Sequence, residues 1–371
     1  MVRSNDEVLL RRAYLKGIKM ANYKKIDISP ELQKLIDYID TFKASWQQLS
    51  HLVPEQLKAL RHVATIESVG SSTRIEGSKL SDREVERILS GLKTESFKSR
   101  DEQEVAGYAY VMEEIFTSYP YIPLTENYIK QLHTLLLQYS TKDERHRGEY
   151  KKFPNHVEAF DTQGKSLGVV FETISPFDTP FRMADLIHWT QHAFDAQEIH
   201  PLVIIGIFIV TFLAIHPFQD GNGRLSRVLT TLLLLKCGYL YVPYSSLETI
   251  VEHTKEGYYR ALRLTQATLK TEKHNFQPWL LYFLRSLGKQ IERLEFKINQ
   301  EQITRISLPK LAIDIIQLVQ DKGQIAMADI IASTGAPRST IKKQLATLVD
   351  QKYLARHGQG RAVWYTRAQR V

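Results

Sequence analysis

Cysteine is almost absent from this sequence of 371 residues, in which Cys237 is the single one. One thiol cannot form an intrachain disulfide, so the small secreted domains that depend on disulfides are excluded as a class. A chain of this length can bury a large core without such cross-links. We therefore expect a cytoplasmic protein in which Cys237 is a buried thiol at the end of a helix.

Long apolar runs are missing as well. The most apolar segment, residues 202–215, has about 14 residues, whereas a helix needs ~20 to span a bilayer. This length is typical of a buried helix in a globular domain. The N-terminal residues mix both charge signs and lack the apolar centre of a secretory signal peptide. We expect no membrane partner.

Several well-known binding patterns are also absent. The sequence contains neither the GxxxxGK[ST] of a P-loop nor the GxGxxG of Rossmann folds and kinases, and it has no HExxH zinc-binding pattern. It does have an excess of basic residues, with 49 Lys and Arg against 41 Asp and Glu and a net charge of +8. A basic surface favours an anionic partner such as a nucleotide or a nucleic acid.

Helical periodicity dominates the sequence and predicts a mainly α protein. Pro54 in a first turn and Gly77 at a C-terminal cap delimit one helix, and the spacing of Ser81 and Glu84 predicts a capping box for the next. Residues 148–176, with their glycines, prolines and β-favouring pieces, predict a β-hairpin. Further helices are expected over residues 30–49, 101–116, 125–137, 183–197, 202–215, 224–236, 256–268 and 278–299.

The last part of the chain, residues 305–371, is predicted to be a separate domain. Three helices, the last over residues 338–354, are followed by a β-hairpin with a glycine turn. This order is typical of a winged helix-turn-helix domain. The other predicted divisions are an N-terminal helical region over residues 1–104 and a core with its following helices over residues 105–300.

The loop that follows residues 202–215 has the composition of an anion-binding site. Gly221 and Gly223 flank Asn222, and glycines permit a positive φ and a close approach of backbone to a ligand. The amides of this loop, together with those that open the next helix, can bind an anion. The loop therefore predicts a phosphate-binding backbone.

Charged side chains accompany this loop. Arg224 and Arg227 lie three residues apart and share one helix face, and paired arginines suit phosphate oxygens. Asp220 offers the hard oxygen ligands that Mg²⁺ on a nucleotide needs. His216 can accept a proton near neutral pH. Together these groups predict a site of phosphoryl or nucleotidyl transfer.

The same residues carry a family resemblance. His216-Pro-Phe-x-Asp-Gly-Asn-Gly-Arg-x-x-Arg227 matches the HPFx(D/E)GNGRxxR signature of Fic-domain proteins at every specified position. The resemblance implies a helical Fic core with a β-hairpin flap over residues 105–270. It also implies transfer of AMP from ATP to a protein hydroxyl. Some members transfer other phosphate-containing groups or remove AMP, and the motif leaves these alternatives open.

The resemblance also implies roles for individual residues. His216 would be the general base on a Tyr, Thr or Ser hydroxyl, and Asp220 would hold Mg²⁺ between the α- and β-phosphates. Arg224 would bind the β-phosphate and Arg227 the γ-phosphate. Asn222 and the backbone of Gly221 and Gly223 would stabilise charge at the α-phosphate. The remaining nucleotide contacts would come from Leu225 and Ser226 and, on the flap, from Asn155, His156 and Val157.

The flap matches the family less closely. Members usually have an arginine shortly after the glycine of the flap, whereas here Lys151 follows Gly148. The expected Asn–aromatic–hydrophobic run corresponds to Asn155, His156 and Val157. The resemblance implies that a protein substrate docks on this flap by strand addition.

The adenine contacts are open between two interpretations. After the motif, residues 257–262 resemble the family segment near the adenine. Tyr258, Tyr259 or Gln266 would line the base in that case. Buried aromatic packing explains the same residues equally well.

A second motif lies upstream of the core. Ser72-Thr-Arg-Ile-Glu76-Gly77 matches the (S/T)xxxE(G/N) inhibitory motif of the same family. Ser72 and Glu76 lie four residues apart on one helix face. A carboxylate in the last turn of a helix opposes the helix dipole, so Glu76 needs a cation. The family implies Arg227, in a pair that would withhold this arginine from the γ-phosphate.

The C-terminal domain leads to a hypothesis of its own. Basic residues of its last helix and wing can meet DNA phosphates, although protein binding or a merely solvated basic face is the alternative. These residues are Arg338, Lys342, Lys343, Arg356, His357 and Arg361.

Three functions therefore stay in view. The first is an autoinhibited protein adenylyltransferase that uses ATP and Mg²⁺ and also modifies itself. The second is transfer of another group, or AMP removal, at the same site. The third is a DNA-binding regulator that uses the Fic core as a sensor. The sequence also leaves open whether the protein forms a homodimer.

Overall fold

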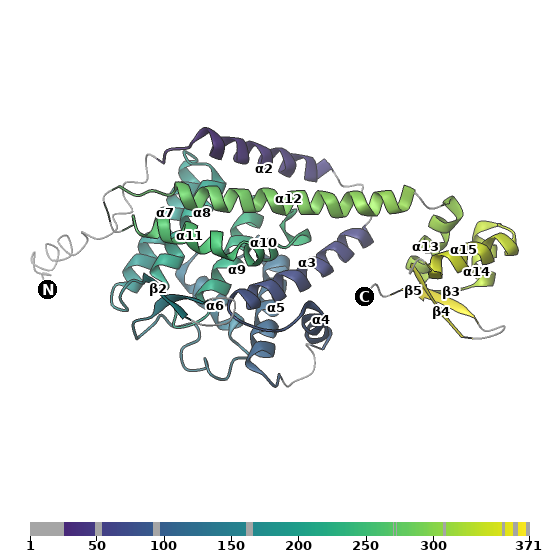
Figure 1. The fold of residues 1–371 in the computed structure, drawn as a ribbon, viewed down its shortest axis with the longest axis horizontal. Helices are drawn as coiled ribbons and strands as arrows, with labels where there is room; N and C mark the ends of the chain where they lie inside the picture. Colours follow the sequence, from purple (N-terminus) through teal and green to yellow (C-terminus); the bar gives the residue numbers. More distant parts are fainter. Residues whose placement is uncertain are drawn as a thin grey trace, which may run out of the picture. The chain divides into compact units, whose positions relative to one another are not determined.

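The computed structural model describes residues 26–48, 54–91, 97–160, 166–269, 271, 273–306, 309–350, 353–358 and 363–368. It is mainly helical, as predicted (Figure 1). It forms two compact units that divide between Leu294 and Glu295. In the part of the chain that the structure describes, no helix is long and apolar enough to cross a membrane.

Helix α3 (Pro54–Ile75) contains Ser72 and ends just before Glu76, the two residues of the upstream motif. α2 (Pro30–Gln48) and α3 (Pro54–Ile75) each begin with a proline, whose fixed φ suits a first turn. Gly77, just beyond α3, has a φ of +107°. Glycine adopts this φ without strain, so the helix ends beside Glu76.

Three helices follow, namely α4 (Asp82–Ser90), α5 (Arg100–Ser118) and α6 (Glu126–Leu136). The predicted capping box of Ser81 and Glu84 is present at the start of α4. Ser99 and Glu102 form another capping box at α5. Because these side chains satisfy free amides of the first turns, the helices begin close to where the sequence predicts.

Two largely buried helices form the centre of the first unit. α8 (Pro201–Ile215) is buried along nearly its whole length, and α9 (Asn222–Lys236) is nearly as enclosed. They pack against each other and contact α3, α5, α6, α7 (Thr179–Ala196) and α11 (Lys255–Gln266) (Figure 1). α3 also packs along α10 (Leu247–His253). The C-terminus of α3 is thereby held in the same unit as the α8–α9 loop.

A β-hairpin stands among these helices, as predicted within residues 148–176. β1 (His156–Phe160) pairs antiparallel with β2 (Ser166–Glu172). His156 lies opposite Glu172, and the register shifts twice farther along the strands. The side chains of both strands lie outside the described residues.

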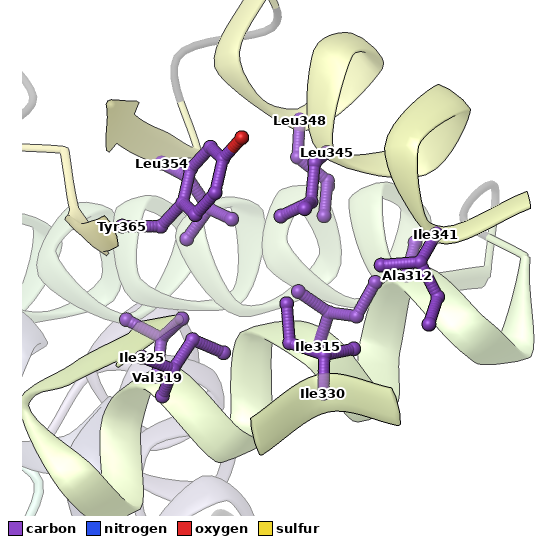
Figure 2. Close-up of a cluster of buried hydrophobic side chains, with 10 residues drawn as sticks. All are labelled: Ala312, Ile315, Val319, Ile325, Ile330, Ile341, Leu345, Leu348, Leu354 and Tyr365. Carbon is purple, nitrogen blue, oxygen red and sulfur yellow. The ribbon is translucent and has the colours of Figure 1, made fainter. Parts of the chain in front are cut away.

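The second unit has a core of its own. It contains α13 (Lys310–Lys322), β3 (Gln324–Ala326), α14 (Met327–Thr334), α15 (Arg338–Asp350), β4 (Leu354–His357) and β5 (Trp364–Arg367). The strands form an antiparallel sheet in the order β3–β5–β4. Figure 2 shows ten buried side chains from its helices and strands packed together. The three helices and the hairpin match the predicted order, while the winged-helix assignment stays a prediction.

Several boundaries differ from the sequence predictions. The 3-10 turn η2 (Val242–Tyr244), α10 and β3 were not predicted, because segments this short show too little periodicity. The predicted helix over residues 338–354 is too long, since Leu354 is buried in β4. α12 (Gln277–Ile306) continues past the predicted end at residue 299. The two compact units divide inside α12, and the predicted domain boundaries at residues 104–105 and 300–305 stay predictions.

Gly107 marks a close approach of α5 to the end of α6. A Cβ at this position would lie 2.0 Å from the carbonyl oxygen of Leu136, a backbone atom that cannot rotate aside. We expect Gly107→Ala to destabilise the protein by about 1–3 kcal/mol, as overpacking does. Urea unfolding measures this loss.

The matched control is Gly288→Ala in α12. There the nearest atom to a new Cβ is Tyr38 Cε1 at 3.7 Å, an ordinary contact. Because alanine favours a helix interior, this variant should be neutral or more stable by up to ~1 kcal/mol. Equal stabilities of the two variants would contradict the close approach at Gly107.

Candidate active site

The loop between α8 and α9 is shaped by its backbone and by one buried side chain. His216 ends α8 with a φ of +53°, and Gly221 precedes α9 with a φ of +78°. The Asn222 amide accepts from the Phe218 N–H at 2.9 Å and donates to the Phe218 carbonyl at 2.7 Å. The side chain of Asn222 therefore holds the loop, and its contact with a phosphate stays a prediction.

His216 is a neutral imidazole at neutral pH. Burial, and then the charge of Lys151, lower the pKa of His216 to about 4. Its Nδ1 lies 3.4 Å from the carbonyl oxygen of Leu213. Because a carbonyl only accepts, this nitrogen carries the proton. Nε2 is then unprotonated, as a general base requires.

His133 on α6 links the loop to the start of the flap segment. Its ring is buried and stacks on Phe218 with 3.8 Å between the centroids. Nδ1 accepts from the Gly148 N–H at 2.8 Å, so Nε2 carries the proton and donates to the Asp220 carbonyl at 2.9 Å. The sequence analysis missed this residue, because nothing in the helical pattern around it indicates a contact with the loop.

The carboxylate of Glu76 lies against the first turn of α9. A Cβ at Gly223 would lie 2.2 Å from Glu76 Oε1, so only a glycine leaves room for this approach. The free amides and the positive dipole end of a helix N-terminus attract anions. Glu76 therefore occupies a position that suits a phosphate group.

Arg227 is bound by the last turns of α3. Its Nη2 lies 2.8 Å from Glu76 Oε1 and 2.9 Å from the Ser72 carbonyl, and its Nε donates to Ser72 Oγ at 2.8 Å. Only 7% of Arg227 is exposed. Burial on its own would lower the pKa of Arg227, but the charge of Glu76 raises it above the ordinary value. The structure thus brings both predicted motifs together.

Arg224 and Asp220 belong to a network of ion pairs with α5. Arg224 lies 3.2 Å from Asp220 and 3.3 Å from Glu104, and Arg100 contacts Asp220 at 2.8 Å. Burial opposes ionisation of Asp220, yet Arg224, the Gly221 amide and Arg100 lower its pKa. The sequence analysis missed Arg100 and Glu104, since both lie far from the motif along the chain.

Arg224 retains unused hydrogen-bonding capacity. Its Nε and Nη1 are buried and form no hydrogen bond with any described residue, and Nη1 has only the ion pair with Glu104 at 3.3 Å. Buried donors of this kind are normally satisfied by a partner. A phosphate oxygen fits them, because guanidinium groups bind phosphate through several N–H groups at once.

Asp220 has the donor chemistry for Mg²⁺. No group of three or more His, Cys, Asp or Glu that could hold a metal ion occurs among the described residues. Mg²⁺ on a nucleotide commonly takes only one or two protein carboxylates, with phosphates and waters as the other ligands. The lowered pKa of Asp220 keeps its carboxylate ionised, so the residue fits such an ion.

The three residues predicted near the adenine are placed differently from one another. Tyr258 is buried, with its ring centroid 5.2 Å from that of Tyr259 and 5.7 Å from that of Trp279. Tyr258 and Arg227 line one small cavity, whereas neither Tyr259 nor Gln266 does. The aromatic packing is present, and contact with an adenine stays a prediction.

The remaining predicted residues lie around the loop. Leu225 and Ser226 are buried in α9, and Ser226 Oγ donates to the Gly223 carbonyl at 2.7 Å. Asn155 donates to the Phe218 carbonyl at 2.8 Å. His156 and Val157 begin β1, and their side chains lie outside the described residues.

Comparison with known families agrees with this geometry. Residues 123–234 match the Fic/DOC family, and this range includes α8, the loop and most of α9. The chain contains a Fic domain. The matched range holds His216, Asp220, Arg224 and Arg227, whereas Glu76 directly follows α3 and lies outside this range.

Curated relatives share a moderate part of the sequence. "Protein adenylyltransferase Fic" from Drosophila mojavensis is 27% identical over 218 residues, which are 58% of this chain and 39% of that protein. The protein of the same name from Drosophila grimshawi is 26% identical over 216 residues, 58% of this chain and 41% of its own length. The matched region spans about two fifths of these relatives.

Solved structures share the fold. A Fic family protein from Desulfovibrio desulfuricans G20 has a TM-score of 0.60 at 22% identity, covering 93% of this chain and 98% of its own. Fic-1 from C. elegans has a TM-score of 0.54 at 22% identity, covering 80% of this chain and 79% of its own. These likenesses support the Fic fold.

His133 and His216, two histidines of the Fic domain with lowered pKa values, should make the protein sensitive to acid. His133 and His216 have pKa values of about 4 in the folded state, against about 6.5 for an ordinary histidine. Between these values the unfolded chain binds more protons, so stability falls as the pH drops below 6.5 towards 4. From pH 7 to pH 5, each histidine should reduce the free energy of unfolding by about 2 kcal/mol.

Urea unfolding of the wild type and of His133→Gln at both pH values tests this. The glutamine keeps a donor near the Asp220 carbonyl but does not titrate. The loss of stability from pH 7 to pH 5 should therefore be about 2 kcal/mol smaller in the variant. An equal loss in both proteins would contradict the buried neutral state of His133.

Proposed function

We propose that this chain is an autoinhibited protein adenylyltransferase that transfers AMP from ATP to a Tyr, Thr or Ser hydroxyl of a protein, itself included. The Fic domain and the relatives named protein adenylyltransferase Fic support the reaction class. One observation carries the proposal: the carboxylate of Glu76 lies against the N-terminus of α9 and on Arg227. A negative group therefore fills the place where the end of a triphosphate would bind.

His216 would act as the general base. Its Nε2 would take the proton of the incoming hydroxyl while the hydroxyl oxygen attacks the α-phosphorus. The new P–O bond forms in line as the bond to the bridging oxygen breaks, and pyrophosphate leaves with the electron pair. The neutral imidazole supports this role, because an imidazolium has no free pair to accept the proton.

The cations of α9 would bind the triphosphate. The buried Nε and Nη1 of Arg224, which form no hydrogen bond with any described residue, suit the β-phosphate, and Arg227 would bind the γ-phosphate once Glu76 is removed. Asp220 would hold Mg²⁺, which when bound neutralises negative charge on the phosphates. The amides of the Gly221–Gly223 loop would face the α-phosphate and stabilise charge there.

Glu76 and the γ-phosphate would compete for one guanidinium. A charge-assisted hydrogen bond contributes ~1.5–3 kcal/mol net, which corresponds to roughly a 10- to 100-fold change in productively bound ATP. The end of α3 is also anchored, because Arg74 pairs with Glu252 at 2.7 Å and with Asp82 at 2.9 Å. Release therefore requires Glu76 to change its rotamer or the last turn of α3 to move.

The flap hairpin would receive the protein substrate. β1 and β2 form a sheet of two strands, so each has an outer edge that pairs with no other described strand. An extended segment of a substrate can add to such an edge by main-chain hydrogen bonds. This mode would present a hydroxyl side chain without demanding a particular sequence.

Labelled nucleotide separates this proposal from the other reactions open to the site. Label from the α-phosphate of ATP would stay on the protein after AMP transfer, whereas label from the γ-phosphate would not. Retention of the γ-label would instead indicate phosphoryl transfer. Loss of AMP from a previously modified protein would indicate AMP removal.

DNA binding by the second unit is a separate hypothesis. Arg338, Lys342 and Lys343 are exposed on α15, and Arg356 is exposed on β4. Contacts of these side chains with phosphates would make binding weaken steeply with salt. Binding that is both salt-dependent and selective for sequence would favour the regulator alternative.

The variant His216→Ala should bind ATP nearly as well as the wild type, because the phosphate contacts come from other groups. It should lose most AMP transfer, since a positioned base contributes roughly 10²–10⁴-fold. Calorimetric binding of ATP and incorporation of α-labelled AMP measure the two properties. Normal transfer by the folded variant would refute the role of His216.

The variant Glu76→Gly should transfer AMP faster than the wild type, because Arg227 becomes free for the γ-phosphate. The expected gain is roughly 10- to 100-fold. Adding Arg227→Ala should abolish the gain, which controls for a general loosening of α3. An unchanged or lower rate in the single variant would remove autoinhibition and leave the Fic domain assignment intact.

A further inference from the structure

Lys151 is a buried cation at the base of the flap. Only 3% of the residue is exposed. Its Nζ donates to Asn155 Oδ1 at 2.9 Å, to Thr173 Oγ1 at 2.8 Å and to the Ile215 carbonyl at 3.1 Å. An ammonium group has three N–H donors, so each donor of Lys151 has a partner.

The three partners come from three segments whose relative positions matter for the proposed reaction. Asn155 directly precedes β1 and Thr173 directly follows β2, so they are the two ends of the flap hairpin. Ile215 directly precedes His216. One side chain thus connects both ends of the flap to the residue next to the proposed base.

The backbone strengthens this connection. The amide of Lys151 donates to the Pro217 carbonyl at 2.9 Å. Asn155 donates to the Phe218 carbonyl at 2.8 Å, and Thr173 donates to Asn155. The base of the flap is therefore attached to the loop on both sides of His216.

The charge of Lys151 is not neutralised by its direct partners, which are an amide, a hydroxyl and a carbonyl. Burial lowers the pKa of Lys151 to about 8. The charged groups that act on His216 are Lys151, which lowers the pKa of the imidazole, and Glu76 and Asp220, which raise it. Lys151 thus opposes protonation of His216.

We propose that Lys151 is a positioning residue for AMP transfer: its ammonium holds the flap in register with His216, with its charge close to the imidazole. This inference rests on the proposed function for its effect on rate. Its effect on the histidine can be measured without any turnover, so the two can fail separately.

The test uses the full chain carrying Lys151→Met, with Lys152→Met as the matched control. Lys152 is the exposed neighbour, outside the site, and is expected to leave all properties unchanged. An NMR titration of the His216 imidazole, in protein without nucleotide, should show its pKa about one unit higher in Lys151→Met and unchanged in Lys152→Met. Lys151→Arg keeps the charge, so its titration separates the effect of the charge on His216 from the effect of lost packing.

Kinetics measure the positioning. In Lys151→Met the kcat for AMP transfer should fall by up to ~10²-fold with the KM for ATP unchanged, because the flap and not the nucleotide is displaced. Lys151→Arg restores the charge but not a compact three-donor head, so it should restore the titration of His216 and only part of kcat. Lys151→Gln, neutral and polar, replaces the methionine variant if that one does not fold.

The outcomes separate the two claims. An unmoved titration of His216, or a kcat equal to that of the wild type, would overturn the role of Lys151. A moved titration with no transfer of AMP by the wild type or by Glu76→Gly would overturn the proposed function, and the electrostatic effect of Lys151 on His216 would stand.

Discussion

The guanidinium of Arg227 can bind either Ser72 and Glu76 or a phosphate. In this structure it binds Ser72 and Glu76. Its contacts with Ser72 and Glu76 join residues about 150 positions apart, and they form inside one compact unit. The carboxylate also lies against Gly223, at the positive end of α9. The same electrostatics that would bind a triphosphate thus stabilise the fold without one, so the proposed inhibition and the proposed binding would both depend on a single cation.

Two further residues, His133 and Lys151, hold the loop and the flap through their hydrogen bonds. His133 bonds Gly148 and the Asp220 carbonyl with its two ring nitrogens, and Lys151 bonds both ends of the flap and Ile215. Together they connect the flap segment to both ends of the α8–α9 loop. Burial of these groups costs desolvation energy, which the complete set of hydrogen bonds offsets. The loop can therefore hold His216 at a positive φ beside the flap.

The sequence predicted the helical fold, the hairpin and the residues of the loop, because their signals are local: helical periodicity, a capping box at Ser81 and glycines beside Asn222. It could not predict α10, which has too few residues for a periodic pattern and is held by packing on α3. It missed His133, Arg100 and Glu104, since contacts between distant segments leave no trace in spacing. The hydrogen bonds of the Asn222 side chain with the backbone of Phe218 could not be predicted either. An asparagine that binds a phosphate and one that binds backbone look alike in a sequence.

The affinity of the protein for ATP, ADP and AMP tests the central claim most directly, since competition at Arg227 concerns only the last phosphate. Isothermal titration calorimetry would compare Glu76→Gly with the wild-type carboxylate, both in the His216→Ala background so that no nucleotide is consumed. The account predicts roughly a 10- to 100-fold gain for ATP and almost none for AMP when Glu76 is removed. Equal gains for all three nucleotides, or no gain for ATP, would contradict it.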